Sequence, residues 1–302
     1  MRNLIQEIKK LKEEKNAIIL AHSYQNIEID EVADFVGDSL YLSQKAKETN
    51  ADIIVFAGVY FMAQTAKIIS PDKKVLLPNL NAGCLMADMI NHAQILDFKT
   101  KYPNIPVVCY INSTAEVKAE CDICCTSSNA IEIVKSLNVP QVLFVPDANL
   151  GKFVEEQLKN VEVITYNGNC PVHHRVSIVD IENIKKKYPL AKTLIHPECK
   201  PEVSELGDYV GSTSGIIDYV KNSSDEQFII VTEKGVTDRL KRDCPEKEFF
   251  VLNENMLCES MKLTTLEEIR DSLIFEKNEI KLDENIRLKS AKCIERMLQV
   301  SK

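Results

Sequence analysis

The sequence predicts an α/β protein in which three similar repeats close around a pseudo-threefold axis. Strand-like apolar runs alternate with helical patterns along the whole chain, which is typical of βαβ units with a parallel sheet. Four features also recur three times in register, at spacings of 86 or 88 residues. Similar units within one chain tend to close like the subunits of a cyclic trimer.

Each repeat contains a strand that ends in a polar or aromatic residue. The three strand-ending residues are His22, Tyr110 and His196. A hydroxyl residue follows each of them 17 residues later: Ser39, Ser127 and Thr213. Two more strand-like runs then lead to a cysteine in each repeat: Cys84, Cys170 and Cys258. A helical pattern follows each cysteine, so every unit is expected to contain three strands and four helices.

The repeat also predicts the domain boundaries. Residues 1–87 form the first α/β unit, residues 88–173 the second and residues 174–275 the third. A charged tail, residues 276–302, is left over. We expect this tail to form a final helix that packs back on the first unit and completes it.

Composition and charge exclude several classes of protein. A net charge of −8 argues against nucleic acid or an anionic membrane surface as the main partner. The N-terminal segment has no apolar leader, and the longest apolar run, residues 53–63, is too short to span a bilayer. Ten cysteines are too few for a disulfide scaffold, so we expect a cytoplasmic protein with reduced thiols.

The three repeated cysteines predict a metal centre. Ligands of parallel α/β sheets bind beyond the carboxyl ends of the strands, so these cysteines would form a triangle about the axis. A zinc ion held there would take water, His173 or His174 as its fourth ligand. A cubane iron–sulfur cluster would instead keep one iron free as a Lewis acid. The spacing of the cysteines does not choose between the two.

Three short polar segments predict anion binding at the same axis. Residues 37–39, 126–128 and 212–214 each begin a helical pattern, where Ser, Thr and Asp act as caps. Capping alone would account for any one of them. Three converging helix N-termini would also offer free N–H groups to a phosphate or a carboxylate.

The ends of the first strands supply candidates for proton transfer. Three pairs of residues two positions apart lie there: His22 and Tyr24, Tyr110 and Asn112, and His196 and Glu198. Both members of such a pair lie on one side of an extended segment. If these side chains point toward the axis, they are candidates for the acid and the base, and Glu198 is the expected base.

The other cysteines have no counterparts in the repeat. Cys121, Cys124 and Cys125 contain a CxxC pattern, which can be redox-active in a cytosolic protein. The pattern lies between a helix and a cap rather than at a strand-to-helix turn, so we interpret it as mostly structural. Four more cysteines are interpreted as packing residues: Cys109, Cys199, Cys244 and Cys293.

Seven segments together resemble the quinolinate synthase family of the bacterial and archaeal route to NAD. They are AHSYQ, YINSTAEVKA, CTSSNA, NGNCPVHHR, HPECKPEV, GSTSGII and CESMKLTTLEEI, and the likeness covers nearly the whole chain. The resemblance implies three Rossmann-like, three-layer αβα domains around a [4Fe-4S] cluster with three cysteine ligands, here Cys84, Cys170 and Cys258. It also implies condensation of iminoaspartate with dihydroxyacetone phosphate to quinolinate, with loss of phosphate and two waters.

The resemblance assigns roles to further residues. Glu198 would move protons, assisted by His22, Tyr24 and Tyr110. A second set would hold carboxylates and phosphate: Ser39, Asn112, Ser127, His196, Ser212 and Thr213. The protein would be a condensing and dehydrating transferase, and the enzyme that supplies iminoaspartate would be a candidate partner.

Two rival functions are also compatible with the residues. One is a different iron–sulfur hydratase or dehydratase of small hydroxy acids, because an open iron suits the removal of a hydroxyl as water. The other is a zinc-holding protein without catalysis. Turnover with iminoaspartate and dihydroxyacetone phosphate would distinguish quinolinate synthase from another dehydratase. Iron and sulfide analysis would distinguish an iron–sulfur protein from a zinc protein.

Overall fold

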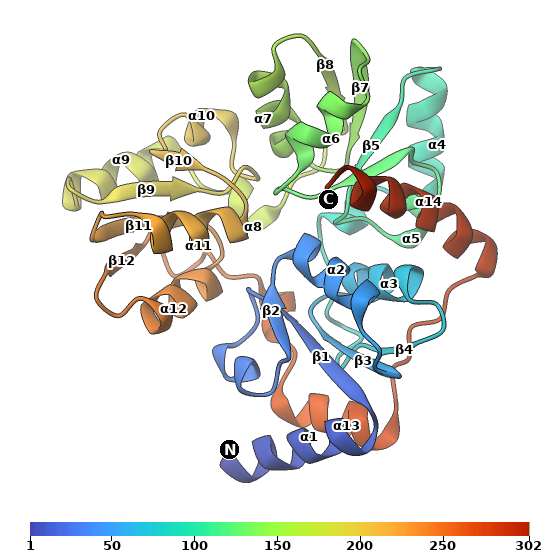
Figure 1. Cartoon of the computed structure of the whole chain (residues 1–302). Helices are drawn as coiled ribbons and strands as arrows, with labels where there is room; N and C mark the ends of the chain where they lie inside the picture. The colour runs from blue at the N-terminus through green and yellow to red at the C-terminus, as the bar shows by residue number, and fades with distance from the viewer. Residues whose placement is uncertain (302) are drawn as a thin grey trace.

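The computed structural model describes residues 1–301 as three α/β units around a common centre (Figure 1). Each unit contains one four-stranded parallel sheet with helices packed around it. The strand orders are β2-β1-β3-β4, β6-β5-β7-β8 and β10-β9-β11-β12, so one topology occurs three times. The prediction of an α/β protein with three Rossmann-like repeats is therefore confirmed.

The strands of the three units correspond one to one. The first sheet contains β1 (Ala17–His22), β2 (Phe35–Gly37), β3 (Ile53–Ala57) and β4 (Lys74–Leu76). The second contains β5 (Val107–Tyr110), β6 (Ile123–Cys125), β7 (Gln141–Val145) and β8 (Glu162–Thr165). The third contains β9 (Lys192–Ile195), β10 (Tyr209–Val210), β11 (Gln227–Val231) and β12 (Glu248–Val251).

The helices follow the same threefold pattern, with two extra helices at the C-terminus. The first unit has α1 (Arg2–Glu14), η1 (Ile27–Glu31), α2 (Ser39–Glu48), α3 (Tyr60–Ile69) and η2 (Ala87–Met89). The second has α4 (His92–Lys101), α5 (Ala115–Lys118), α6 (Ala130–Ser136), α7 (Ala148–Leu158) and α8 (Pro171–His174). The third has α9 (Ile178–Lys187), α10 (Pro201–Ser204), α11 (Thr213–Asn222), α12 (Lys234–Asp243) and η3 (Glu259–Lys262). The last two helices are α13 (Leu266–Phe275) and α14 (Glu284–Val300).

Each unit contains one strand more than the sequence predicts. β2, β6 and β10 are two or three residues long and form an edge of their sheets, next to the first strand of the unit. Each lies between two helices, where the sequence analysis expected only helices. A run of two or three residues is too short to show a period of two, so it carries no strand signal.

The central strands are apolar because helices cover both faces of the sheets. Every residue of β3 and of β5 is buried. β1 pairs with β3 in parallel register from Ala17↔Ile53 to Ala21↔Ala57. Parallel strands buried on both faces need such continuous apolar runs. Polar residues begin where these strands end, and the loops that follow line a central cavity.

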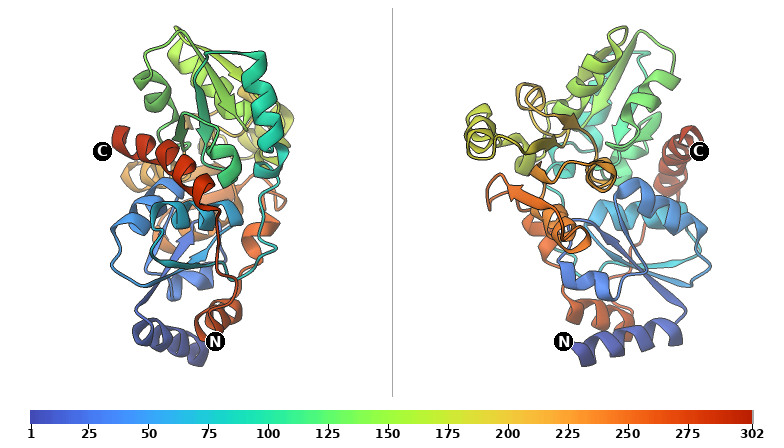
Figure 2. Two further views of the ribbon diagram at one scale, coloured as in Figure 1. Left: turned by 90° about the vertical axis from the view of Figure 1, so that its right-hand side faces the viewer. Right: turned by 60° about the vertical axis from the view of Figure 1, so that its left-hand side comes forward.

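Residues 276–300 connect the first two units, and we call this segment the C-terminal strap. Its first part runs beside β4: Leu77 N–H donates to the carbonyl of Asn278 (3.1 Å), and Ile280 N–H to that of Val75 (2.9 Å). α14 then packs on β6 and α5 of the second unit and on α3 of the first (Figure 2). The tail forms the expected helix, and most of its contacts are with the second unit.

The domain boundaries derived from the repeat stay a prediction. α13 belongs to the third unit by its place in the sequence, yet it packs against α1 and β3 of the first unit. The sequence repeat and the packing of the C-terminal helices therefore divide the chain differently. No helix of the described residues is both long and apolar enough to cross a membrane.

Candidate active site

A central cavity of about 470 Å³ lies where the three units meet. The structure brings these sequence-predicted residues together in its wall: His22, Tyr24, Ser39, Cys84, Tyr110, Asn112, Ser127, Cys170, His196, Glu198, Thr213 and Cys258. Two residues considered for the site from the sequence do not line the cavity: Ser212, and His174, which was a candidate zinc ligand together with His173. The roles of all these residues stay predictions, but their convergence gives them a common site.

The three repeated cysteines follow the last strand of each unit, namely β4, β8 and β12. One backbone hydrogen bond recurs in the three loops. The first residue of the helix after the third strand donates its N–H to the carbonyl two positions before the cysteine. The pairs are Tyr60 to Ala82 (2.7 Å), Ala148 to Gly168 (2.8 Å) and Lys234 to Met256 (2.7 Å). This shared contact brings equivalent loops, and hence the cysteines, to one cavity.

Asp147 is a fully buried carboxylate that supports the loop of Cys170. One oxygen accepts a hydrogen bond from Leu150 N–H (2.8 Å) and caps α7, and the other accepts from Cys170 N–H (3.3 Å). Asp147 was not predicted as a site residue from the sequence, because capping explains an Asp before a helix. The repeat could have identified it: Asp147 lies two residues after β7, and an acidic residue, Glu233, lies two residues after the equivalent strand β11.

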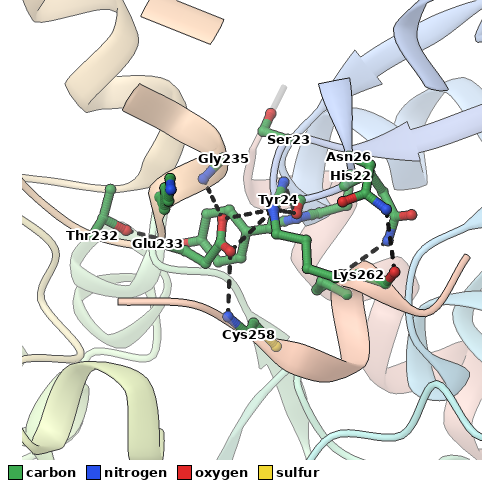
Figure 3. A network of polar contacts seen from close by, with 12 residues as sticks. His22, Ser23, Tyr24, Asn26, Thr232, Glu233, Gly235, Cys258 and Lys262 are labelled. Carbon is green, nitrogen blue, oxygen red and sulfur yellow. Dashed lines mark hydrogen bonds and ion pairs between the residues drawn. The ribbon is translucent and has the colours of Figure 1, made fainter. Parts of the chain in front are cut away.

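Glu233 makes the equivalent contact in the third unit and adds an ion pair. It accepts a hydrogen bond from Cys258 N–H (3.3 Å), and its Oε1 lies 3.1 Å from Nζ of Lys262. Lys262 also donates to the backbone carbonyl of Tyr24. Figure 3 shows this network, which joins the cysteine loop of the third unit to the first unit. In the first unit Val59 takes the equivalent position. Because valine has no carboxylate, the N–H of Cys84 lacks the hydrogen bond that Asp147 and Glu233 provide in the other units.

Several donor atoms of the cavity are suited to a metal centre. Cys170, His173 and Glu198 are the one group in residues 1–301 whose three ligand atoms all lie within 4.8 Å of one another. The three repeated cysteines are spread more widely. Burial raises the pKa of Cys84 to about 12, and it also raises the pKa values of Cys170 and Cys258. A metal centre would therefore have to displace protons from these thiols.

Glu198 is a buried carboxylate held by two side chains. Its Oε1 accepts a hydrogen bond from the Tyr110 hydroxyl (2.7 Å), and its Oε2 lies 2.8 Å from Nδ1 of His173. Burial disfavours the charged form, but His173 and the Tyr110 hydroxyl outweigh it and lower the pKa of Glu198 below its usual range. Burial and the charge of Glu198 raise the pKa of Tyr110, which therefore stays a hydrogen-bond donor.

Tyr24 links the first unit to the third through hydroxyl groups. Its hydroxyl accepts a hydrogen bond from Thr213 (3.0 Å) and lies 3.0 Å from Oγ1 of Thr232. Thr232 in turn lies 3.0 Å from Nε2 of His173. Burial and the charge of Glu198 raise the pKa of Tyr24. A continuous chain of polar contacts thus leads from Thr213 to Glu198. The sequence analysis missed Thr232, and it considered His173 only as a zinc ligand.

Two buried imidazoles complete this part of the wall. Burial lowers the pKa of His22 to about 4 and that of His196 to about 3, so both are neutral near pH 7. The His22 ring lies edge-on to Tyr24, with centroids 4.6 Å apart. The His196 ring stacks on His173 at 4.7 Å. Both can exchange hydrogen bonds with a substrate without adding charge.

The helix starts near the cavity differ from one another. Ser212 caps α11 by accepting a hydrogen bond from Gly215 N–H (3.1 Å), while Thr213, the first residue of the helix, lines the cavity. α2 begins at Ser39 in the same way, with Asp38 as its cap. The hydroxyl of Ser212 is therefore occupied by its own helix, and the neighbouring residue faces the cavity.

In the second unit, residues 126–128 do not begin the helix as expected. α6 begins at Ala130, three residues after Ser127, so Ser127 lines the cavity from the loop before the helix. Asn112 also lines the cavity, and its Oδ1 is buried without a hydrogen-bond partner among the described residues. A buried acceptor of this kind is costly unless a ligand or water satisfies it. This oxygen is free to accept a hydrogen bond from a molecule in the cavity.

Comparison with known proteins shows the family of the chain. The model of the family described as Quinolinate synthetase A protein matches residues 6–299. The chain is 54% identical to the quinolinate synthase of Alkaliphilus metalliredigens, over 99% of this chain and 98% of that protein. It is 48% identical to those of Caldicellulosiruptor bescii (97% of each chain) and Clostridium perfringens strain 13 (96% of this chain, 97% of that protein). The chain therefore belongs to the quinolinate synthase family.

Proposed function

We propose that this chain condenses iminoaspartate with dihydroxyacetone phosphate to form quinolinate, releasing phosphate and two waters. The observation that carries the proposal is the convergence of three cysteine loops and the Glu198 network on one cavity. The relatives that share nearly the whole chain are named quinolinate synthase. A cytoplasmic location would suit its free thiols, which need a reducing compartment.

Cys84, Cys170 and Cys258 would hold a [4Fe-4S] cluster. Three thiolates on one tetrahedral zinc, each about 2.3 Å from the metal, would lie about 3.8 Å apart. The three sulfurs here do not all lie within 4.8 Å of one another. A cubane cluster binds each thiolate at a different iron, which suits the wider spacing. When bound, it would supply a Lewis-acidic iron at the corner without a cysteine.

The residues around Glu198 would move protons. A carboxylate with a lowered pKa is a weak base by itself, so we assign proton uptake to Glu198 together with His173, which is 2.8 Å away. Tyr110 stays protonated and would donate to a developing oxyanion. Tyr24 would do the same from the other end of the chain of hydroxyls.

Neutral and polar groups would bind the anionic ends of the substrates. Thr213 and Ser39 are the first residues of α11 and α2, whose N-terminal N–H groups attract phosphate or carboxylate. Ser127 and His196 would add hydrogen bonds. Asn112 would gain the partner that its buried Oδ1 lacks among residues 1–301. Ser212 would act indirectly, by capping the helix that carries Thr213.

A single zinc ion is the second candidate, because one observation favours it. Cys170, His173 and Glu198 offer one ligand atom each within 4.8 Å, a geometry that suits one ion. This arrangement would leave Cys84 and Cys258 without a role. It would also make Glu198 a ligand rather than a base.

Analysis of anaerobically purified protein separates the two candidates. We expect a brown protein with iron and acid-labile sulfide, which forms quinolinate when iminoaspartate and dihydroxyacetone phosphate are both supplied. Omitting either substrate is the matched control. Stoichiometric zinc without sulfide would refute the cluster, and a full cluster without quinolinate formation would point to a different dehydratase.

A further inference from the structure

A second group of cysteines lies outside the central cavity, beneath α14. Cys109 is on β5, Cys124 on β6 and Cys293 on α14, and all three are buried. Cys121 lies just before β6 and is half-buried. The Sγ atoms of Cys124 and Cys293 are 3.1 Å apart, although the two residues are 169 positions apart in the chain. This distance is only about 1 Å longer than a disulfide bond, which is about 2.05 Å.

The four thiols form a continuous series. Cys109 and Cys124 are register partners on adjacent strands. Cys121 and Cys124 both lie close enough to Cys109 to change the pKa of its thiol. The series therefore runs from half-buried Cys121 through Cys109 and Cys124 to Cys293. Cys125 is excluded because successive residues of a strand point to opposite faces of the sheet.

A buried lysine lies near these thiols, and burial lowers the pKa of its ammonium group whereas the thiols raise it. The side chain of Lys118 is fully buried, and its Nζ donates to the carbonyl of Ser113 (2.6 Å) and the hydroxyl of Thr65 (3.1 Å), both of which are neutral. Burial opposes ionisation of Cys109. The neighbouring Cys121 and Cys124 thiols and Lys118 outweigh it, so the pKa of the Cys109 thiol is lowered. Burial raises the pKa values of Cys121, Cys124 and Cys293. Thiolate is the reactive form in disulfide exchange.

The spacing suits a disulfide better than a metal. No three of these sulfurs, all within the described residues, lie within 4.8 Å of one another, as the ligands of a single ion would. We propose that Cys124 and Cys293 form a reversible disulfide, which is reached from the surface through Cys121 and Cys109.

The reaction is a series of thiol–disulfide exchanges with a low-molecular-weight disulfide, RSSR. Cys121 passes its proton to the Cys109 thiolate and attacks RSSR, and the released RS⁻ takes up that proton to become RSH. Cys109 then displaces the second RSH and forms a Cys109–Cys121 bond. Attack by Cys124 on the sulfur of Cys109 frees Cys121, and attack by Cys293 on the sulfur of Cys124 frees Cys109. In sum, Cys124 and Cys293 lose two protons and two electrons, and RSSR becomes two RSH.

The product would fix the C-terminal strap covalently. The strap pairs with β4 of the first unit, and α14 packs on β6 of the second. Figure 2 shows α14 lying across these two units. A Cys124–Cys293 bond would therefore hold α14 on the second unit when local opening would otherwise release it.

Peptide mapping of the holoprotein tests the proposal. The anaerobic protein is treated with oxidised glutathione, free thiols are alkylated, and the unreduced protein is digested with trypsin. We expect residues 119–135 to be linked to residues 293–296 through Cys124 and Cys293, with Cys121 and Cys125 of the same peptide alkylated. Dithiothreitol should reverse the link, and the visible absorption of the holoprotein should not change.

Three variants sharpen the test. Cys293→Ser should lose the linked peptide, whereas Cys244→Ser, a buried cysteine in the third unit, should keep it. Cys121→Ser should slow its formation by about tenfold or more, because the entry point is gone. Cys293 that stays fully alkylatable in the wild-type protein would overturn the proposal, as would a link that forms only after denaturation. Because the wild-type map decides by itself, an unstable Cys293→Ser protein does not weaken the test.

Discussion

The protein contains two groups of sulfur atoms, and their surroundings differ. In the first, Cys84, Cys170 and Cys258 each lie on a separate loop of the central cavity, and the repeat keeps them apart. In the second, the thiols of Cys124 and Cys293 are already in contact beneath α14. The same side chain can thus face a shared ligand or another thiol. The spacing that the fold imposes decides which.

The second group occupies positions that are apolar in the other units. Cys124 on β6 corresponds to Val36 on β2 and Val210 on β10, as the strand registers show. Cysteine behaves as a small hydrophobic residue when buried, so packing explains its presence there. The reactivity that we infer arises only because α14 adds Cys293.

Removing one thiolate of the first group should have the largest effect. Cys170→Ser takes one ligand from a three-cysteine site, so bound iron, acid-labile sulfide and quinolinate formation should all be lost. Cys109→Ser changes the same atom in the second group and should leave all three near the wild-type level. Iron and sulfide analysis of anaerobically purified proteins measures the difference. A Cys170→Ser protein with a full iron load would show that the ligand assignment is wrong.

Replacing the expected base should have a smaller effect, which lowers the reaction rate but keeps the metal centre and substrate binding. Glu198→Gln keeps the shape and one acceptor but cannot take up a proton, so quinolinate formation should fall by about 10²–10⁴-fold. The iron content should stay unchanged, since Glu198 is not a proposed ligand. The measurement is anaerobic turnover together with the change in visible absorption when substrate is added.

The matched control for this variant is Glu202→Gln, an exposed carboxylate four residues further along the chain. It should turn over like the wild-type protein. Wild-type turnover in Glu198→Gln would remove Glu198 from the proton-transfer steps. Loss of iron in that variant would instead show that Glu198 helps to hold the metal centre.

These two regions also show how much of the site could be read from the sequence. The repeat made Cys84, Cys170 and Cys258 predictable as a set, because equal spacing in equal units brings residues to equivalent places. Asp147 and Glu233 were missed because their contacts with the cysteine N–H groups depend on how each loop folds back on the helix before it. A sequence pattern within one segment cannot predict a contact between two segments that are more than 20 residues apart.

Other features could not be predicted because the strands are too short or because the contacting residues are far apart in the sequence. β2, β6 and β10 are too short to show a strand pattern. The contact between Cys124 and Cys293 depends on the docking of α14 against β6, across 169 positions of the chain. Packing of this kind follows from the tertiary structure, so the CxxC pattern alone indicated only a structural role.

The cavity should also respond to acid through its buried imidazoles. The folded protein binds a proton at His22 only near pH 4, whereas the unfolded chain does so below about pH 6.5. The unfolded state therefore takes up protons that the folded state does not, so stability falls as the pH falls from 6.5 towards 4. The contribution of His22 is about 2 kcal/mol at pH 5 relative to pH 8.

Urea unfolding at pH 8 and pH 5 measures this contribution. His22→Asn should lose about 2 kcal/mol less stability between the two pH values than the wild-type protein. His92→Asn, which makes the same replacement at an exposed histidine outside the cavity, is the matched control. Equal pH dependence in His22→Asn and the wild-type protein would contradict the neutral, buried imidazole.

The smallest effects should distinguish two adjacent residues at the start of α11. Thr213 lines the cavity, whereas the hydroxyl of Ser212 caps the helix. When phosphate binds, the Thr213 hydroxyl would turn from Tyr24 to the anion. Thr213→Ala would remove this hydrogen bond to a charged group, about 1.5–3 kcal/mol, so the apparent affinity for dihydroxyacetone phosphate should fall at least about tenfold. Ser212→Ala should instead cost about 1 kcal/mol in the free energy of unfolding, as loss of a cap does.

Substrate titration and urea unfolding of both variants separate these outcomes. Thr213→Ala should keep its iron content and nearly wild-type stability, because its hydroxyl donates only to Tyr24 in a chain of neutral groups. Ser39→Ala, at the equivalent start of α2, should weaken phosphate-substrate use in the same way. If neither Thr213→Ala nor Ser39→Ala changes the dependence on dihydroxyacetone phosphate, the helix starts do not bind phosphate. The anion would then have to bind at Asn112 and His196, on the first-strand loops of the second and third units.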